Sequence, residues 1–243
     1  MLSGKIAIFI SVLIFCIISY LICSVNFAII FTKKFAHTDV REHGSGNAGM
    51  TNVMRTAGKK LGIFTFLGDF LKGTVSVLLG KYLFLELASL LVKIFDSKNA
   101  FSGAENYLNP DIVAFLMGVF CLLGHMFPIY FGFKGGKGVS TIVGSAAAFS
   151  PFTALFAFIT FLISVFASKI VSISSIIAVL VAIPLSYIFF DKSSEYVLFG
   201  SHQALVATCL MAVMSLMVIL KHHENIKRLI KGEEKKFSVK KEG

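Results

Sequence analysis

Glycine and small polar residues crowd one polar stretch, which reads His43-Gly-Ser-Gly-Asn-Ala-Gly-Met-Thr-Asn52 and is followed by Arg55. Glycines let the backbone approach a ligand closely and point successive N–H groups at it. The hydroxyl and amide side chains add neutral donors, and the arginine adds a planar cation suited to phosphate. A flexible surface loop is the alternative interpretation. The candidate site residues of this stretch are Ser45, Gly46, Asn47, Gly49, Thr51, Asn52 and Arg55.

A second glycine-rich segment, Phe133-Lys-Gly-Gly-Lys-Gly138, stands directly before an apolar run that begins at Val139. Such a turn at a helix N-terminus presents free N–H groups and the positive end of the helix dipole to an anion. It lacks the full G-x-x-x-x-G-K-[ST] pattern and no strand precedes it, so a nucleotide P-loop fits poorly. A tight turn with orienting lysines is the alternative. The candidates are Gly135, Gly136, Lys137 and Gly138.

A third polar segment, Lys221-His-His-Glu-Asn-Ile-Lys-Arg228, follows the last apolar run. His222 and Asn225 are three residues apart and share a helix face, and these two residues and Arg228 are the candidates of this segment. Adjacent histidines on a helix point about 100° apart and chelate a metal poorly. We therefore expect no metal and no cofactor here. A solvated helix end that binds anionic lipid is the alternative.

Several polar residues lie inside or at the start of apolar runs. Asp69 and Lys72 are three residues apart, and such a pair persists within a membrane span when it lies near a functional cavity. His125 is more often a structural histidine than a catalyst at such a position, but it is a candidate. Ser172 and Ser175 begin a later run, where they either cap the helix or bind a ligand.

The composition sets the class of protein. Of the 243 residues, 56% are hydrophobic and only 15% are charged, against about 45–50% and 25% in soluble domains. The excess comes in long blocks, which predicts an all-α, polytopic integral membrane protein.

The four cysteines also lie in apolar runs, where we expect small buried hydrophobes rather than a disulfide or a zinc site.

Seven transmembrane helices are expected. The run at 139–167 is long for one span, and Ser150-Pro151 near its middle favours a break into two helices. Residues 81–95 either continue the second helix or lie at the interface. The expected spans are 6–31, 61–80, 112–131, two within 139–167, 172–190 and 203–220. They form a catalytic domain over residues 1–220, followed by a basic tail, 221–243, whose first residues belong to the site.

Positive charge is distributed unevenly between the two sides of this topology. The connections 32–60, 132–138, 168–171 and 221–243 carry 17 Lys and Arg residues, and the alternate connections carry three. The positive-inside rule places the first set in the cytoplasm, with the N-terminus outside and the C-terminus cytoplasmic. The net charge of +10 is thereby explained without nucleic acid as a partner. All three polar segments fall on the cytoplasmic side.

Five stretches resemble the acyl-phosphate:glycerol-3-phosphate acyltransferase (PlsY) family of bacteria, in the order of that family. They are GSGNAGMTNVMR (44–55), GDFLKG (68–73), GHMFPIYFGFKGGKGVST (124–141), SKIVSISS (168–175) and KHHENIKRLIKGEE (221–234). The resemblance implies a seven-helix membrane protein whose site faces the cytoplasm. It departs from the family at 81–110, which is longer than typical and lies on the outer side.

The resemblance also implies roles for individual residues. Ser45 and Arg55 match residues that the family needs for activity, and Gly135–Gly138 match its glycerol-3-phosphate site. His222 and Asn225 match residues important for turnover. Glu224 is similar to a structural carboxylate of the family, and either Ser172 or Ser175 matches its serine.

The implied reaction moves a fatty acyl group from acyl phosphate to the 1-hydroxyl of glycerol 3-phosphate. Its products are lysophosphatidate and phosphate, in the first step of membrane phospholipid synthesis at the bacterial cytoplasmic (inner) membrane. We expect direct attack on the acyl carbon, with Arg55 and Lys137 holding negative charge. The lipid bilayer and the enzyme that supplies acyl phosphate are the expected partners. An organic-phosphate transporter and a lipid-binding scaffold are the rival hypotheses.

Overall fold

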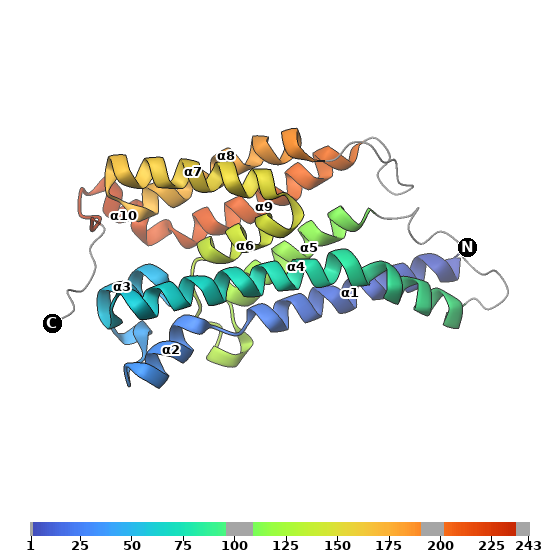
Figure 1. Cartoon of the computed structure of the whole chain (residues 1–243), viewed down its shortest axis with the longest axis horizontal. Coiled ribbons are helices and arrows are strands. Elements are labelled where there is room, and N and C mark those ends of the chain that lie inside the picture. Colours follow the sequence, from blue (N-terminus) through green and yellow to red (C-terminus); the bar gives the residue numbers. More distant parts are fainter. Residues whose placement is uncertain (1, 96–108, 191–201, 237–243) are drawn as a thin grey trace.

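The chain folds as a bundle of helices. The computed structural model describes residues 2–95, 109–190 and 202–236, and there it contains helices and connecting segments only. Figure 1 shows α2, α3 and α10 at one end of the bundle and the beginning of α1 at the other. The helices are α1 (Leu2–Cys23), α2 (Phe27–Phe35), α3 (Met50–Ala57), α4 (Lys59–Phe95), α5 (Pro110–Met126), α6 (Val139–Phe149), α7 (Pro151–Ser168), α8 (Val171–Phe189), α9 (Gln203–Lys221) and α10 (His223–Ile230), with short 3₁₀ helices at Val40–Glu42 and Ile129–Phe131.

Six segments of the described chain are long and apolar enough to cross a membrane, so the protein is an integral, multi-pass membrane protein. They are 5–35, 59–94, 110–131, 151–168, 171–189 and 203–221. Helix α6 has 11 residues, which rise about 16 Å, roughly half of the ~30 Å hydrocarbon core. The predicted count of seven spans is therefore not confirmed by helix length. Most of the predicted outer connections, 96–111 and 191–202, lie outside the described residues.

Helix boundaries follow the local sequence signals at the proline break and along α4, but not in the first predicted span, and α5 ends at Met126, before the predicted end of the third span at 131. The predicted break at Ser150-Pro151 is confirmed, because α6 ends at Phe149 and α7 begins at Pro151. Residues 81–95 continue the second helix, which gives α4 a length of 37 residues. The predicted first span is interrupted: α1 ends at Cys23, and Asn26 caps α2 by accepting a hydrogen bond from the backbone N–H of Ile29 at 3.1 Å.

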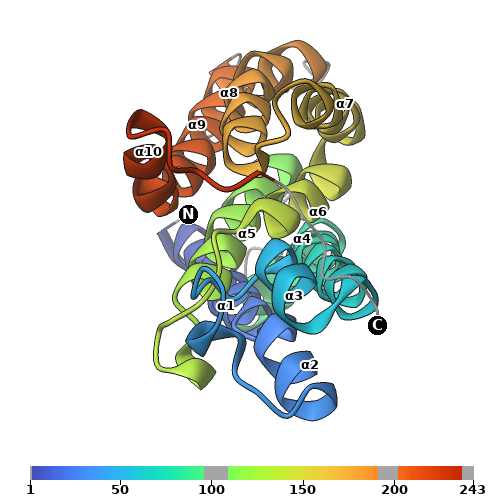
Figure 2. The same cartoon turned by 90° about the vertical axis from the view of Figure 1, so that its left-hand side faces the viewer.

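Helix α4 is the central element, because it packs against α1, α3, α5 and α6, whereas α7 packs mainly against α8. The crossing of α4 and α6 is close. A β-carbon added to Gly144 would overlap the backbone carbonyl of Phe70, and one added to Gly73 would lie 2.6 Å from the carbonyl oxygen of Thr141. Two glycines thus let the backbones of α4 and α6 meet, and Figure 2 shows these two helices side by side.

Two cysteines depart from expectation. Cys23 at the end of α1 and Cys121 in α5 form a disulfide, with their Cα atoms 5.0 Å apart. Both are fully buried where these two helices pack. The expectation of four free, buried cysteines was therefore wrong, because the contact joins residues 98 positions apart that no local spacing connects.

Candidate active site

One cavity, of about 580 Å³, gathers the three polar segments at the end of the bundle that carries α3 and α10. All five residues predicted to be catalytic line it, and so do most of the predicted substrate-binding residues. The predicted residues that line it are Ser45, Asn47, Gly49, Thr51, Asn52, Arg55, Asp69, His125, Lys137, Gly138, Ser172, Ser175, His222, Asn225 and Arg228.

Four predicted residues are not among those that line this cavity. Gly46 and Gly135 line a smaller polar pocket next to it, and Gly136 lines neither pocket. Lys72 is buried, and its Nζ donates to the carbonyl oxygen of Val25 at 2.6 Å and pairs with Asp69 at 3.0 Å. Its ammonium therefore binds a backbone carbonyl in the connection between α1 and α2 and does not line the cavity.

Three helix N-termini converge on the cavity. Gly49 and Thr51 belong to the start of α3, Gly138 precedes α6, and Ser172 lies in the first turn of α8. The first N–H groups of a helix have no intrahelical acceptor, and they carry the positive end of the dipole. The cavity therefore offers backbone donors as well as cationic side chains to an anion.

Asn52 holds the first glycine-rich loop in shape. Its side-chain amide donates to the carbonyl oxygens of Val40 and His43, each at 2.9 Å, and its Oδ1 accepts from the backbone N–H of Ser45 at 2.8 Å. Both amide hydrogens and one lone pair of the amide oxygen of this buried side chain are thus engaged within the loop. We conclude that Asn52 positions Ser45 at the cavity.

Two cations inside the cavity are available for an anionic ligand. Arg55 has a buried Nε without a hydrogen-bond partner among the described residues. The Lys137 ammonium donates to Oδ1 of Asn225, a neutral group. Burial lowers the pKa of Lys137 to about 8, with Arg228 and Arg55 acting in the same direction and Glu234 opposing them. A buried ammonium without a carboxylate partner gains stability when an anion binds.

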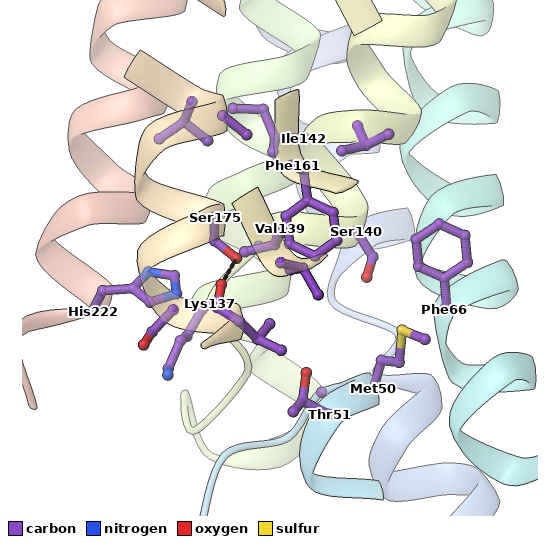
Figure 3. Close-up of a pocket in the computed structure, with 18 of the residues that line it drawn as sticks. Met50, Thr51, Phe66, Lys137, Val139, Ser140, Ile142, Phe161, Ser175 and His222 are labelled. Carbon is purple, nitrogen blue, oxygen red and sulfur yellow. Dashed lines mark hydrogen bonds between the residues drawn. The ribbon is translucent and has the colours of Figure 1, made fainter. Parts of the chain in front are cut away.

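His222 presents one defined nitrogen to the cavity. Its Nδ1 lies 2.7 Å from the carbonyl oxygen of Val218, which can only accept, so Nδ1 carries the hydrogen and Nε2 keeps its lone pair. Burial and the charge of Lys137 lower the pKa of His222 to about 4. Figure 3 shows His222, Lys137 and Ser175 on one side of the cavity, facing Met50, Thr51 and Phe66 on the other.

Sequence reasoning missed Glu234. Its carboxylate accepts hydrogen bonds from Ser172 at 2.8 Å and from Asn225, and it pairs with Arg228 at 2.7 Å. Burial works to raise the pKa of Glu234, but these three donors outweigh it and hold the pKa below its usual value. Glu224, expected to be the structural carboxylate, is instead exposed and pairs with Lys227 at 3.0 Å.

A chain reversal brings Glu234 back to the cavity. Gly232 follows α10 with a φ of 71°, and the N–H of Glu233 donates to the carbonyl oxygen of Arg228 at 2.8 Å. A left-handed glycine of this kind is a usual helix end. The sequence Lys-Gly-Glu-Glu directly after α10 could therefore have indicated that the chain reverses here and returns a carboxylate to the site.

The remainder of the cavity is apolar and runs between α6, α7 and α8. Ile142 and Val143 line it from α6, and Phe158 and Phe161 line it from α7. Phe66 of α4 completes this lining near the polar end (Figure 3). A cavity with a cationic head and an apolar body fits an anionic amphiphile, and it places the anion beside Lys137 and Arg55.

The chain matches known proteins over nearly its whole length. The glycerol-3-phosphate acyltransferase family model matches residues 13–232. A glycerol-3-phosphate acyltransferase of Neisseria gonorrhoeae is 37% identical over 223 residues, covering 92% of this chain and 96% of the relative. That of Bartonella quintana is 36% identical over 223 residues and covers 92% and 90%.

Solved structures agree with these relatives. The crystal structure of PlsY (YgiH), an integral membrane glycerol 3-phosphate acyltransferase, in its glycerol 3-phosphate form has a TM-score of 0.71 and 34% identity. Its lysophosphatidic acid form has a TM-score of 0.70 and 32% identity, and each alignment covers 94% of this chain and 96% of the other. By sequence, family model and fold together, the chain belongs to the glycerol-3-phosphate acyltransferase family.

Proposed function

We propose that this protein transfers a fatty acyl group from acyl phosphate to the 1-hydroxyl of glycerol 3-phosphate. The products would be lysophosphatidate and phosphate, and the reaction would begin membrane phospholipid synthesis. The observation that carries the proposal is the single cavity in which Arg55, Lys137 and three helix N-termini meet an apolar compartment. The glycerol 3-phosphate and lysophosphatidic acid forms of PlsY, a relative of the same fold, support both ends of this reaction.

The charges suit two phosphates. Arg55, Lys137 and Arg228 line the cavity, and Glu234 offsets only part of their charge. Acyl phosphate and glycerol 3-phosphate both bring anions, so cationic groups and free N–H groups lower the repulsion between the two substrates. In our proposal Arg55 holds one phosphate, while Lys137 and the start of α6 hold the other.

We propose direct transfer without a covalent enzyme intermediate. The 1-hydroxyl oxygen attacks the acyl carbonyl carbon, a new C–O ester bond forms, and the bond between the acyl carbon and the phosphate oxygen breaks. The electron pair of that bond leaves with phosphate, which also accepts the hydroxyl proton. Lys137 and nearby N–H groups stabilise the negative charge that develops on the acyl oxygen.

His222 orients the acceptor in this scheme. Its Nε2 lone pair can accept a hydrogen bond from the 1-hydroxyl, while the Nδ1 hydrogen is held by Val218. With a pKa of about 4, the imidazole is too weak a base to keep the proton at neutral pH. Its contribution is therefore the alignment of the oxygen lone pair with the acyl carbon.

For the topology we propose seven membrane helices, with the N-terminus outside and the C-terminus in the cytoplasm of a bacterial cell. Figure 1 shows α6 beginning part-way along the bundle, so the loop at 132–138 enters the bundle and α6 needs only part of the membrane thickness. The site would then face the cytoplasm at the inner membrane. The bundle over 1–220 and the first residues of the 221–243 tail both contribute to it.

The decisive test incubates the purified protein with palmitoyl phosphate and labelled glycerol 3-phosphate. The expected result is lysophosphatidate and inorganic phosphate in equal amounts, with no product from the matching acyl thioester. An Arg55→Ala variant should lose most of this activity. Transfer from the thioester alone would overturn the donor assignment. Uptake of labelled glycerol 3-phosphate into proteoliposomes without lysophosphatidate would favour a transporter instead.

A further inference from the structure

The apolar arm of the cavity extends far from the charged end. On α8 the lining extends from Ser172 to Ala182, a separation of ten residues, and Met211 of α9 lines the cavity eleven residues before His222, which directly follows that helix. Helical rise converts both to a depth of about 15 to 17 Å. That depth is about half of the ~30 Å hydrocarbon core, the share that one leaflet occupies. The arm is therefore long enough to hold one acyl chain of a membrane lipid.

The far end of the arm is enclosed by small side chains and one methionine. Ala146 of α6, Ala154 of α7 and Ala182 of α8 are each at most 7% exposed, and Met211 of α9 is fully buried. All four line the cavity. By contrast Phe158, closer to the charged end on α7, is 36% exposed. The arm is therefore more accessible beside α7 than at its far end.

Buried aromatic rings pack behind these residues. Phe149, three residues beyond Ala146 on α6, stacks on Phe115 of α5 with ring centroids 3.9 Å apart. Phe190, directly after α8, packs against the same Phe115 with ring centroids 6.3 Å apart. All three rings are buried. Close-packed aromatic rings do not yield readily to extra methylenes.

We propose that Ala182, Ala154 and Met211 determine the longest acyl chain that the protein transfers. This inference rests on the proposed function, because the acyl chain of the donor is the occupant of the arm. With the acyl phosphate head fixed near Lys137, the terminal methyl group of a long chain reaches these residues. Each methylene that finds no space there lowers the specificity constant, since one methylene in an apolar pocket changes it by about 10- to 200-fold.

A competition assay tests this directly. The purified full-length protein receives an equimolar mixture of dodecanoyl, tetradecanoyl and hexadecanoyl phosphate with glycerol 3-phosphate, and mass spectrometry measures the lysophosphatidate species. In Ala182→Leu or Ala154→Leu, the ratio of hexadecanoyl to dodecanoyl product should fall by about tenfold or more. In Met211→Ala, which removes volume from the same end, the ratio should rise.

Ala167→Leu is the matched control. Ala167 also lies on α7, but it is exposed and is not among the residues that line the cavity, so the same substitution should leave the product ratio unchanged. A folded Ala182→Leu protein with the wild-type ratio would overturn the inference and leave the proposed function intact. If Ala182→Leu does not fold, Ala182→Val and Met211→Ala decide, and unchanged ratios in both overturn it.

A binding measurement separates this inference from catalysis. Lysophosphatidates of increasing chain length should raise the Tm of the purified protein until the arm is full, because a ligand stabilises the state that binds it. In Ala182→Leu that limit should come at a shorter chain. A protein that turns over no acyl phosphate but shows this shift would refute the proposed function alone. An identical limit in both proteins would refute the chain-length assignment.

Discussion

The imidazole of His125 packs directly against the backbone of Gly136, so that a β-carbon added to this glycine would overlap Nε2. The same β-carbon would lie 2.6 Å from the carbonyl oxygen of Ala48, and the N–H of Gly136 donates to the carbonyl oxygen of His125 at 3.2 Å. The end of α5 and the first glycine-rich loop therefore hold the second loop between them. This contact therefore also fixes the position of Lys137, the next residue.

Gly136→Ala should consequently displace Lys137 and lower kcat/KM by about 100-fold, since a shift of about 1 Å in a catalytic group has that effect. Steady-state kinetics with glycerol 3-phosphate varied will measure it. Gly132→Ala is the control in the same connection: its φ of 65° strains an alanine, but no atom lies within 4 Å of the added carbon. It should cost stability while kcat/KM stays near the wild-type value, and equal losses in both variants would contradict the assignment.

Asp69→Asn should destabilise the fold strongly. Asp69 and Lys72 are at most 5% exposed, and removing the carboxylate leaves a buried ammonium without its counter-charge. Breaking such a pair costs about 3–5 kcal/mol. Unfolding in a fixed mixed-micelle system should show this as a lower Tm.

The half-buried pair of Lys81 and Asp111 supplies the control, because its atoms are also in contact, at 2.7 Å, but its side chains are 27% and 24% exposed. Asp111→Asn should cost about 1 kcal/mol or less. The double variant Asp69→Asn/Lys72→Met should recover part of the loss. Equal destabilisation by Asp69→Asn and Asp111→Asn would refute the role of burial.

The sequence correctly predicted that its polar segments meet in one site, because all of them follow the same pattern. Glycine-rich and basic connections alternate with apolar runs, and the charge bias put them on one side, where Arg55, Lys137 and His222 now line one cavity. Proline chemistry likewise predicted the turn at Ser150-Pro151. These signals are local or depend on the order of segments along the chain, so they can be read from the sequence without knowing how the helices pack.

Side-chain partners could not be predicted in the same way. The spacing of Asp69 and Lys72 correctly put them on one helix face, but only the packed structure shows that Lys72 caps the carbonyl of Val25. Glu234 reaches Ser172 across 62 residues, and a turn at Gly232 decides its direction. Such contacts depend on how elements far apart in the sequence pack, which periodicity does not record.

The activity should fall at alkaline pH because Lys137 loses its proton. With a pKa near 8, the ammonium prevails below that pH and disappears above it, so kcat/KM should decrease about tenfold per pH unit beyond pH 8. Lys137→Arg keeps its charge throughout this range and should lack the decrease, at a lower absolute rate. A wild-type profile that stays flat to pH 10, or an identical decrease in Lys137→Arg, would refute the role of this ammonium.

His222 should remain neutral across the working range. Its pKa of about 4 means that the folded protein carries an uncharged imidazole between pH 5.5 and 8. The chain has six histidines, so NMR of histidine-labelled protein can identify the signal of His222 as the one that His222→Gln removes. That signal should not shift over this range. A signal that titrates near pH 6.5 and vanishes in the variant would contradict the proposed hydrogen-bond acceptor.

Glu234→Gln should move the alkaline limb of the activity to lower pH. The negative charge of Glu234 raises the pKa of Lys137 against the effect of burial, so its removal lets the ammonium lose its proton more readily. The variant also removes the partner of Arg228, and kcat/KM at pH 7 should fall. The measurement is the pH dependence of kcat/KM between pH 6 and pH 10.

Glu224→Gln makes the matched comparison, because it removes the same charge from the same short tail segment. Glu224 is exposed, pairs only with His223 and Lys227 among the described residues, and is not among the residues that line the cavity. Solvent screens such a charge, so the limb should stay where it is in the wild type. If both variants displace the limb equally, the effect comes from net charge, and Glu234 does not set the protonation of Lys137.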